Sequence, residues 1–158
     1  GGYGNYGEQM AYNSGMITFM MASKGNSTGW GDTTDSGHDN VNGASNHVRG
    51  IYALGADSAS PYDGESAIDY TILATGGNAT SFGDLTHHVN RPGAAASNIR
   101  VVIAGGRIAE GGSSIGKYTE IDSILIASTG GGTSFGDLSI ARDQFGGTSD
   151  CHGGLGGY

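Results

Sequence analysis

The stretch Ile68-Asp69-Tyr70-Thr71-Ile72-Leu73-Ala74-Thr75-Gly76-Gly77-Asn78-Ala79-Thr80-Ser81-Phe82-Gly83-Asp84-Leu85 decides the fold, because the chain contains it more than once. A second copy runs from Ile121 to Leu138, and a more divergent copy runs from Met16 to Asp32. The copies recur at a spacing of about 52 residues, which is in the range of propellers, solenoids and other repeat arrays. The sequence therefore predicts an array of similar units. The matching aspartates are Asp32, Asp84 and Asp137.

The repeat divides the chain into three units within one repeat domain, residues 1–158. Recurring glycines place the units at about 2–54, 55–105 and 106–157. We expect this domain to be part of a larger closed propeller or assembly.

Each unit is predicted to contain three to four short antiparallel strands. An apolar segment between glycines, such as Arg49–Gly55 or Arg100–Gly106, favours a buried inner strand, and Cys151–Gly157 is a weaker version. A variable polar loop follows, as in Arg107–Thr119. The strand Ile68–Thr75 then pairs with the aromatic strand in a hairpin whose loop contains glycine. No segment has sustained helical periodicity, so we expect an all-β fold with one sheet per unit, stacked as blades.

Composition favours an ordered chain. Of 158 residues, 32 are glycine and 2 are proline, and 36% are hydrophobic. The glycines alternate with β-branched and aromatic segments at matching positions of the repeat, so they indicate turns between short strands.

The charge limits the choice of partners. The net charge is −8, and the seven Lys and Arg residues are scattered, so the chain cannot neutralise a row of phosphates. We therefore expect neither nucleic-acid binding nor membrane insertion, and no apolar run approaches the length of a membrane-spanning helix. The single cysteine, Cys151, has no intrachain disulfide partner.

The glycine pairs Gly105-Gly106 and Gly156-Gly157, together with an aromatic residue in each outer strand, resemble kelch-type β-propeller repeats. The sequence of Ile68–Leu85 is similar to Gly-rich kelch-like repeats of large virion structural proteins of aquatic tailed phages and of environmental microbial surface proteins. The resemblance implies display and interaction surfaces at an extracellular or virion location. Tyr70 lies further before Phe82 than the tyrosine of ordinary kelch units, and a β-solenoid or stacked β-sandwich is the alternative fold.

Three blades cannot close a propeller, which needs about four to eight. We therefore expect copies of this chain, or further blades of the same chain, as partners. Surface glycans are a further candidate partner.

Two kinds of residue recur at matching positions of the units. The aromatic residues are predicted to pack between blades, and each aspartate after the aromatic-glycine pair is predicted to accept backbone N–H bonds in a turn at a strand end. The aromatic residues are Trp30, Phe82 and Phe135, and the turn residues are Asp32, Asp84 and Asp137.

Two N-glycosylation sequons lie at the same point of two units. They begin at Asn26 and Asn78, in the turn before the aromatic strand, where a glycan would project into solvent. The alternative is that asparagine, like glycine, serves left-handed turn geometry.

A metal site has less support from the sequence than these structural roles. Two groups of carboxylates offer oxygen ligands that would suit calcium, but neither matches a known calcium loop, and we favour solvated loops without a cofactor. The adjacent His87 and His88 should point to opposite faces of a strand. The two carboxylate groups are Asp32, Asp35 and Asp39, and Asp57, Asp63 and Glu65.

The chain has no Gly-x-Ser-x-Gly motif and no nucleophile beside a supporting histidine, so we expect no catalytic residue and no enzyme activity. The leading hypothesis is a non-catalytic structural or adhesive repeat module of an extracellular fibre, filament or virion appendage. The alternative is a carbohydrate-binding or host-recognition β-propeller.

Overall fold

The computed structural model describes residues 2–6, 9–20, 22–35, 40–56, 64–110 and 113–149. Every strand pair in this part of the chain is antiparallel, and no helix occurs in it. The prediction of an all-β fold is confirmed. No sheet of the described residues closes on itself.

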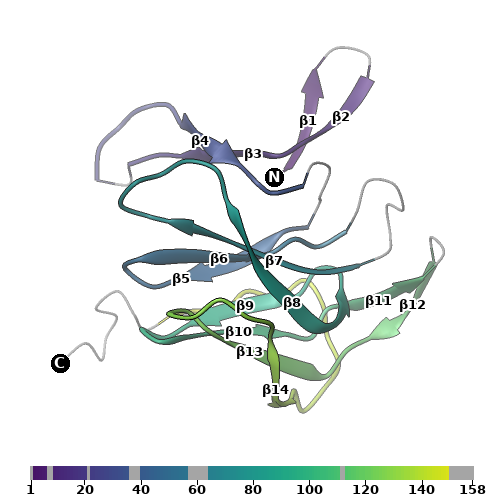
Figure 1. Ribbon diagram of the computed structural model, residues 1–158. Coiled ribbons are helices and arrows are strands. Elements are labelled where there is room, and N and C mark those ends of the chain that lie inside the picture. Colours follow the sequence, from purple (N-terminus) through teal and green to yellow (C-terminus); the bar gives the residue numbers. More distant parts are fainter. Residues whose placement is uncertain are drawn as a thin grey trace.

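Two four-stranded sheets form the body of the molecule (Figure 1). In each sheet the strands lie side by side in the order in which they follow in the sequence. The first sheet, called the β5–β8 sheet, contains β5 (Asn42–Ser45), β6 (Arg49–Ala53), β7 (Glu65–Ile72) and β8 (Thr80–Val89). The second, called the β9–β14 sheet, contains β9 (Gly93–Ala96), β10 (Arg100–Ala104), β13 (Glu120–Leu125) and β14 (Thr133–Asp137).

Three two-stranded sheets complete the described structure. They are β1 (Gly2–Tyr6) with β2 (Gln9–Asn13), β3 (Gly15–Thr18) with β4 (Thr28–Asp32), and β11 (Arg107–Glu110) with β12 (Ser113–Lys117). The last pair corrects one prediction, because the sequence assigned Arg107–Thr119 to a variable polar loop. The segment is a hairpin inserted between β10 and β13.

The repeated stretch forms the same hairpin three times. β3–β4, β7–β8 and β13–β14 each carry a register shift directly after the first aligned position of the repeat, as expected for a β-bulge that bends and twists the strand. The shifts lie between Met16 and Ile17, Ile68 and Asp69, and Ile121 and Asp122. Ile17, Asp69 and Asp122 therefore occupy the same place in the three hairpins.

The hydrophobic core lies between the two four-stranded sheets, which stack face to face in Figure 1. Ile51, Ile68 and Phe82 come from the first sheet, and Val101 and Ile124 come from the second. Alternate strand residues point to opposite faces, so one face of each sheet supplies this core. The sequence predicted three stacked blades. The described residues form two four-stranded sheets, and the third copy of the repeat is present only as hairpin β3–β4, which stands above them in the figure.

Candidate assembly interface

Two junctions join the repeated elements. The first lies between hairpin β3–β4 and the β5–β8 sheet, and the second lies between the two four-stranded sheets (Figure 1). We call the surface of each element that contacts the following element its front face, and the opposite surface its back face. Both junctions use equivalent residues, so each can be compared with the other.

A buried aspartate locks each junction. Asp69 and Asp122 are 1% exposed. At the first junction Thr34 donates its backbone N–H to Asp69 Oδ2 at 2.8 Å and its hydroxyl to Oδ1 at 2.7 Å. At the second, Thr86 donates N–H to Asp122 Oδ2 at 2.7 Å and its hydroxyl to Oδ1 at 2.8 Å. A buried carboxylate is stable only when it is hydrogen-bonded, so these threonines satisfy the charge of the following unit.

A glycine loop forms the second repeated contact. Gly77 N–H donates to the Trp30 carbonyl at 3.0 Å, and Gly130 N–H donates to the Phe82 carbonyl at 2.9 Å. Two residues further along each loop, a second N–H donates to the carbonyl of the aspartate after the aromatic-glycine pair. These second bonds are Ala79 to Asp32 and Gly132 to Asp84, both at 2.7 Å.

The glycine after each aromatic residue allows this close approach. Gly83 has φ +144°, and a Cβ at this position would lie 2.7 Å from the carbonyl carbon of Gly130. Any side chain would therefore force the backbone of the two units apart. The recurring aromatic-glycine pair thus has a steric cause at the junction.

The three aromatic candidates lie in different surroundings. Phe82 is 4% exposed, belongs to the core, and meets the ring of Tyr70 edge-on at 5.7 Å between centroids. Trp30 is half-buried, and Phe135 is 55% exposed. The difference follows from position, because the β9–β14 sheet covers the front face that carries Phe82, and no described strand covers the front face that carries Phe135.

The turn candidates accept side-chain hydroxyl bonds within their own unit. Asp32 Oδ1 accepts from Ser14 at 2.9 Å, Asp84 Oδ1 from Ser66 at 3.2 Å, and Asp137 Oδ1 from Thr119 at 3.1 Å. The donor in each case lies near the start of the partner strand. These carboxylates are exposed, in contrast to the buried pair at the junctions.

An arginine adds a contact at the second junction. Arg49 places its guanidinium over the Tyr70 ring at 5.0 Å and donates from Nη1 to the Ile126 carbonyl of the next sheet at 2.7 Å. Arg100 occupies the same position one unit later, over Phe135 at 5.5 Å. Its Nε is buried and has no hydrogen-bond partner among the described residues.

The two sequon asparagines differ in their contacts. Asn78 Oδ1 accepts the backbone N–H of Asp32 at 3.1 Å, so this side chain bridges the first junction. Asn26 occupies the equivalent place before Trp30 and is exposed. The structure therefore gives Asn78 a role in packing of the units, while the glycosylation prediction stays a prediction.

The residues considered for metal binding do not gather in the described part of the chain, where no group of three or more His, Cys, Asp or Glu side chains could hold an ion. His87 Nδ1 lies 3.1 Å from the Thr86 hydroxyl, and His88 Nδ1 lies 2.9 Å from the Gly64 carbonyl. Asp39, Asp57 and Asp63, and also Cys151, lie outside the described residues.

A charged cluster holds the segment after β14 against hairpin β11–β12. Asp143 contacts Lys117 Nζ at 2.6 Å and Arg107 Nη2 at 3.2 Å. The hydrogen bond from Lys117 is the largest cause that lowers the pKa of Asp143 below its ordinary value, and the positive charge of Arg107 acts in the same direction.

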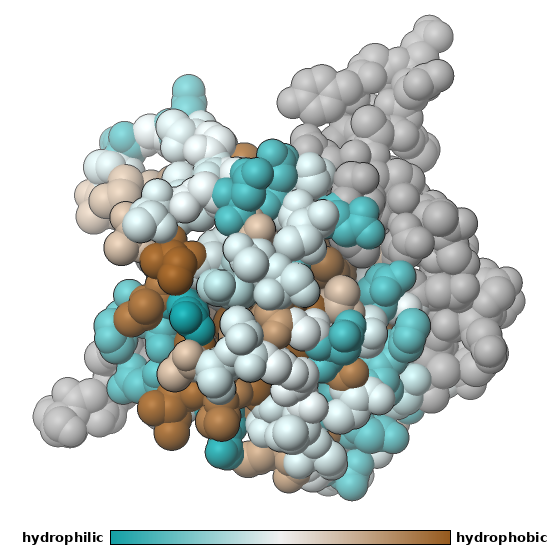
Figure 2. All heavy atoms as spheres, viewed as in Figure 1, coloured by the Kyte–Doolittle hydropathy of each residue, from teal (hydrophilic) through white to brown (hydrophobic). Residues whose placement is uncertain are grey.

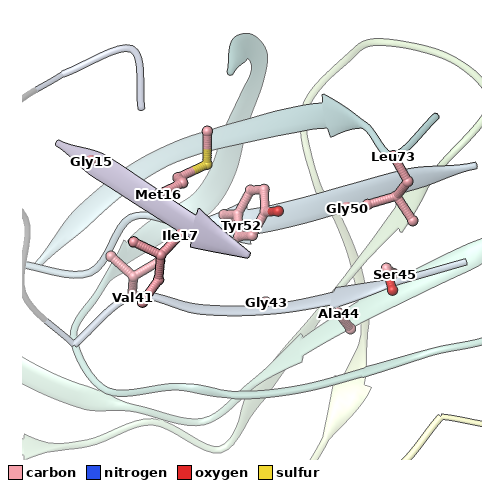
Figure 3. Close-up of a pocket in the computed structure, with 10 residues that line it drawn as sticks. All are labelled: Gly15, Met16, Ile17, Val41, Gly43, Ala44, Ser45, Gly50, Tyr52 and Leu73. Atoms are coloured by element: carbon pink, nitrogen blue, oxygen red, sulfur yellow. The ribbon is translucent and has the colours of Figure 1, made fainter. Parts of the chain in front are cut away.

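An open groove of about 570 Å³ lies between β3 and the inner strands of the β5–β8 sheet (Figure 3). Met16, Ile17 and Val41 gather at one end, and the Tyr52 ring stands in the middle. The Tyr52 hydroxyl lies 3.1 Å from Thr71 Oγ1. The walls are mostly small and apolar, so the groove suits a packed strand or an apolar ligand face better than a charged molecule.

From the sequence alone we assigned no role to Asp69 or Asp122. Thr34 and Thr86 were not singled out either. A signal was present, because both aspartates interrupt an apolar strand at the same repeat position. The divergent copy has Ile17 there, which explains why the position did not stand out.

Chemically, the described arrangement is a set of directional contacts between units. Carbonyls and hydroxyls on a front face meet N–H groups and carboxylates on the next back face. No family model and no curated protein matches the chain. The described residues include no helix long and apolar enough to cross a membrane.

Proposed function

We propose that this chain is a non-catalytic structural and adhesive repeat module of an extracellular fibre, filament or virion appendage. Its units act as kelch-like blades of a propeller-type array, with a linear solenoid or sandwich stack as the alternative arrangement. The observation that carries the proposal is the repetition of one junction, in which Thr34 and Asp69 are matched by Thr86 and Asp122.

The junction supports a mechanical role. Each one combines two bonds to a buried carboxylate with two bonds between main-chain groups, and the second adds a hydrophobic core. Such units are stabilised mainly by their neighbours, as in other repeat proteins. Stiffness along the array is the property that this design provides.

The variable segments support a display role. Hairpin β11–β12 extends away from the sheets in Figure 1, and it belongs to the stretch between β10 and β13, whose sequence differs from that between β6 and β7. Differences between units are therefore concentrated outside the junctions. A net charge of −8 keeps such surfaces soluble and disfavours non-specific contact between like-charged copies.

Immunoelectron microscopy of the source material tests this function. Antibodies raised against the recombinant chain should label fibres, filaments or particle appendages, and prior absorption with the chain should remove the label. Label confined to the cell interior would contradict the proposal. Turnover of a panel of fluorogenic glycosides by the chain would contradict its non-catalytic part.

The second candidate function is carbohydrate binding or host recognition. Tyr52 favours it, because an aromatic ring on the wall of an open groove can stack on a sugar face. A glycan array separates the two candidates. Saturable binding that is lost in Tyr52→Ala would favour recognition, and no binding above background would favour the structural role.

A further inference from the structure

The front face of the β9–β14 sheet is built like a junction, but no described strand covers it. Val102 takes the position of Ile51, and Phe135 takes the position of Phe82. Ile51 and Phe82 are covered by the next sheet, whereas Val102 is partly exposed and Phe135 is 55% exposed. Leu125 on the same face is 53% exposed. Figure 2 shows hydrophobic residues in brown that reach the surface on the side in view.

The polar groups of this front face are also open. A Cβ on Gly136 would meet no atom within 4 Å, whereas the equivalent Cβ on Gly83 would collide with the loop at Gly130. Arg100, whose buried Nε has no hydrogen-bond partner among the described residues, holds the position from which Nη1 of Arg49 reaches the next sheet. The glycine and the arginine of a third junction are therefore in place.

The back face of hairpin β3–β4 has the complementary features. Gly25, Asn26 and Ser27 hold the positions of the junction loop, and all three are exposed. Ile17 is 69% exposed and Phe19 is 63% exposed. Phe19 takes the place of Ile124, which is fully buried at the second junction. One end of the array therefore offers the acceptor side of a junction, and the other offers the donor side.

The strands are complementary as well. Residues 146–149 run along β9, because the Ser149 hydroxyl accepts the Ala96 N–H at 3.0 Å and a Cβ on Gly147 would collide with the Ala94 carbonyl. This is the position that β9 holds against β5, where Asn42 Nδ2 donates to the Pro92 carbonyl at 2.6 Å. The segment thus takes the place that β5 and β9 hold at one edge of the two four-stranded sheets, while β3–β4 is an outer hairpin whose sheet has two strands.

We propose that copies of this chain associate head to tail, so that the front face of β13–β14 in one copy packs on the back face of β3–β4 in the next. Residues 146–149 of the first copy then extend toward the groove that lies beside β3 of the second (Figure 3). The proposal rests on the proposed function of a stacking module, and it specifies a second copy as the occupant.

Equivalence with the two internal junctions specifies the new bonds. Gly25 N–H donates to the Phe135 carbonyl, Ser27 N–H donates to the Asp137 carbonyl, and Asp137 N–H donates to Asn26 Oδ1. Ser139 takes the place of Thr86 and meets Ile17, where the internal junctions have a buried aspartate. The contact between copies therefore lacks the hydrogen bonds to a carboxylate and depends more on buried apolar surface. The interface is heterologous, because different surfaces of each copy meet.

Sedimentation velocity of the purified chain over a concentration series tests the association. We expect species larger than the monomer that grow with concentration. Because each copy carries a charge of −8, raising the salt concentration should strengthen association by screening repulsion. A chain that stays monomeric at every concentration and in high salt would overturn the proposal and leave the faces to another occupant.

Two charge variants test the polarity of the contact. Phe135→Asp alters the front face and Phe19→Asp alters the back face, and both side chains are exposed, so the fold should persist by circular dichroism. Each variant alone should raise the dissociation constant by about 30-fold or more, as for a central interface residue. Mixed together, they should form a one-to-one dimer, because each keeps the face that the other lacks.

Ile99→Asp is the matched control. Ile99 is 68% exposed in the turn between β9 and β10, outside both faces, so this change should leave association unchanged. If Ile99→Asp weakens association as much as the face variants do, the association is non-specific and hydrophobic, and the proposal fails. A mixture of the two face variants that stays monomeric would also overturn it.

Directed disulfides test the register. On a Cys151→Ser background, Ser139→Cys and Ile17→Cys place thiols where Thr86 and Asp122 meet at the second junction. Mixing the two variants under oxidation should give a disulfide-linked dimer, and neither variant alone should do so. Equal cross-linking of the single variants would contradict the register.

The two proposals fail in different ways. A monomeric chain whose antibody labels fibres would remove the head-to-tail contact and leave the proposed function standing. A self-associating chain whose antibody labels only the cell interior would do the reverse.

Discussion

Replacement of Asp122 by alanine should destabilise the second junction severely. The carboxylate accepts the N–H of Thr86 at 2.7 Å and its hydroxyl at 2.8 Å, and it is 1% exposed. Hydrogen bonds to a charged group contribute about 1.5 kcal/mol or more each, and the stranded donors keep their desolvation cost. The expected loss is about 3 kcal/mol, a large part of the stability of a small domain.

Urea unfolding followed by circular dichroism measures this loss. The urea concentration at the midpoint should fall, while the slope of the unfolding free energy against urea concentration stays unchanged. Asp137→Ala is the matched control, because this exposed carboxylate accepts one bond, from Thr119. It should cost less than about 1 kcal/mol. A double-mutant cycle with Thr86→Val should show a coupling of about 1 kcal/mol or more between Asp122 and Thr86. Equal losses of stability in the two alanine variants, or a coupling near zero, would refute the role of Asp122 at the junction.

Three further results are expected. Phe82→Ala should lower stability by about 3 kcal/mol in thermal unfolding, whereas Phe135→Ala should cost far less in the isolated monomer, because only the first ring is buried. Gly83→Ala should lower the melting temperature more than Gly136→Ala, since both have positive φ but only the first would collide with another unit. The pKa of Asp143 is lowered in the folded state, so this carboxylate adds stability at pH above its unfolded pKa of about 3.9. That contribution is lost as the pH falls through the folded pKa. Asp143→Asn should therefore make the free energy of unfolding fall less steeply with pH in the acid range.

The sequence predicted the repeated hairpins because their information is local. β-branched residues, a glycine loop and an aromatic strand all lie within Ile68–Leu85, and the same pattern gives β13–β14. Hairpin β11–β12 was assigned to a loop because its polar residues carry no alternating apolar pattern that would indicate a half-buried strand.

The junctions could not be predicted in the same way, because their partners lie far apart in the sequence. Thr34 and Asp69 belong to different units, and nothing in the residues near either one identifies the other. Likewise, Phe82 and Phe135 occupy equivalent places in the repeat, yet only the first is buried, because burial depends on which sheet covers the face.

The glycine loops have a consequence for how such a protein can change its length. Gly77 and Gly130 connect the units through main-chain atoms alone, so this part of the contact does not depend on the side chains that a unit carries. Duplication of one whole period in the gene would add a unit that already fits its neighbours on both sides. Loss of part of a period would instead separate each aromatic-glycine pair from the loop that it meets. The design therefore tolerates evolution in whole repeats, with the outward segments free to diverge.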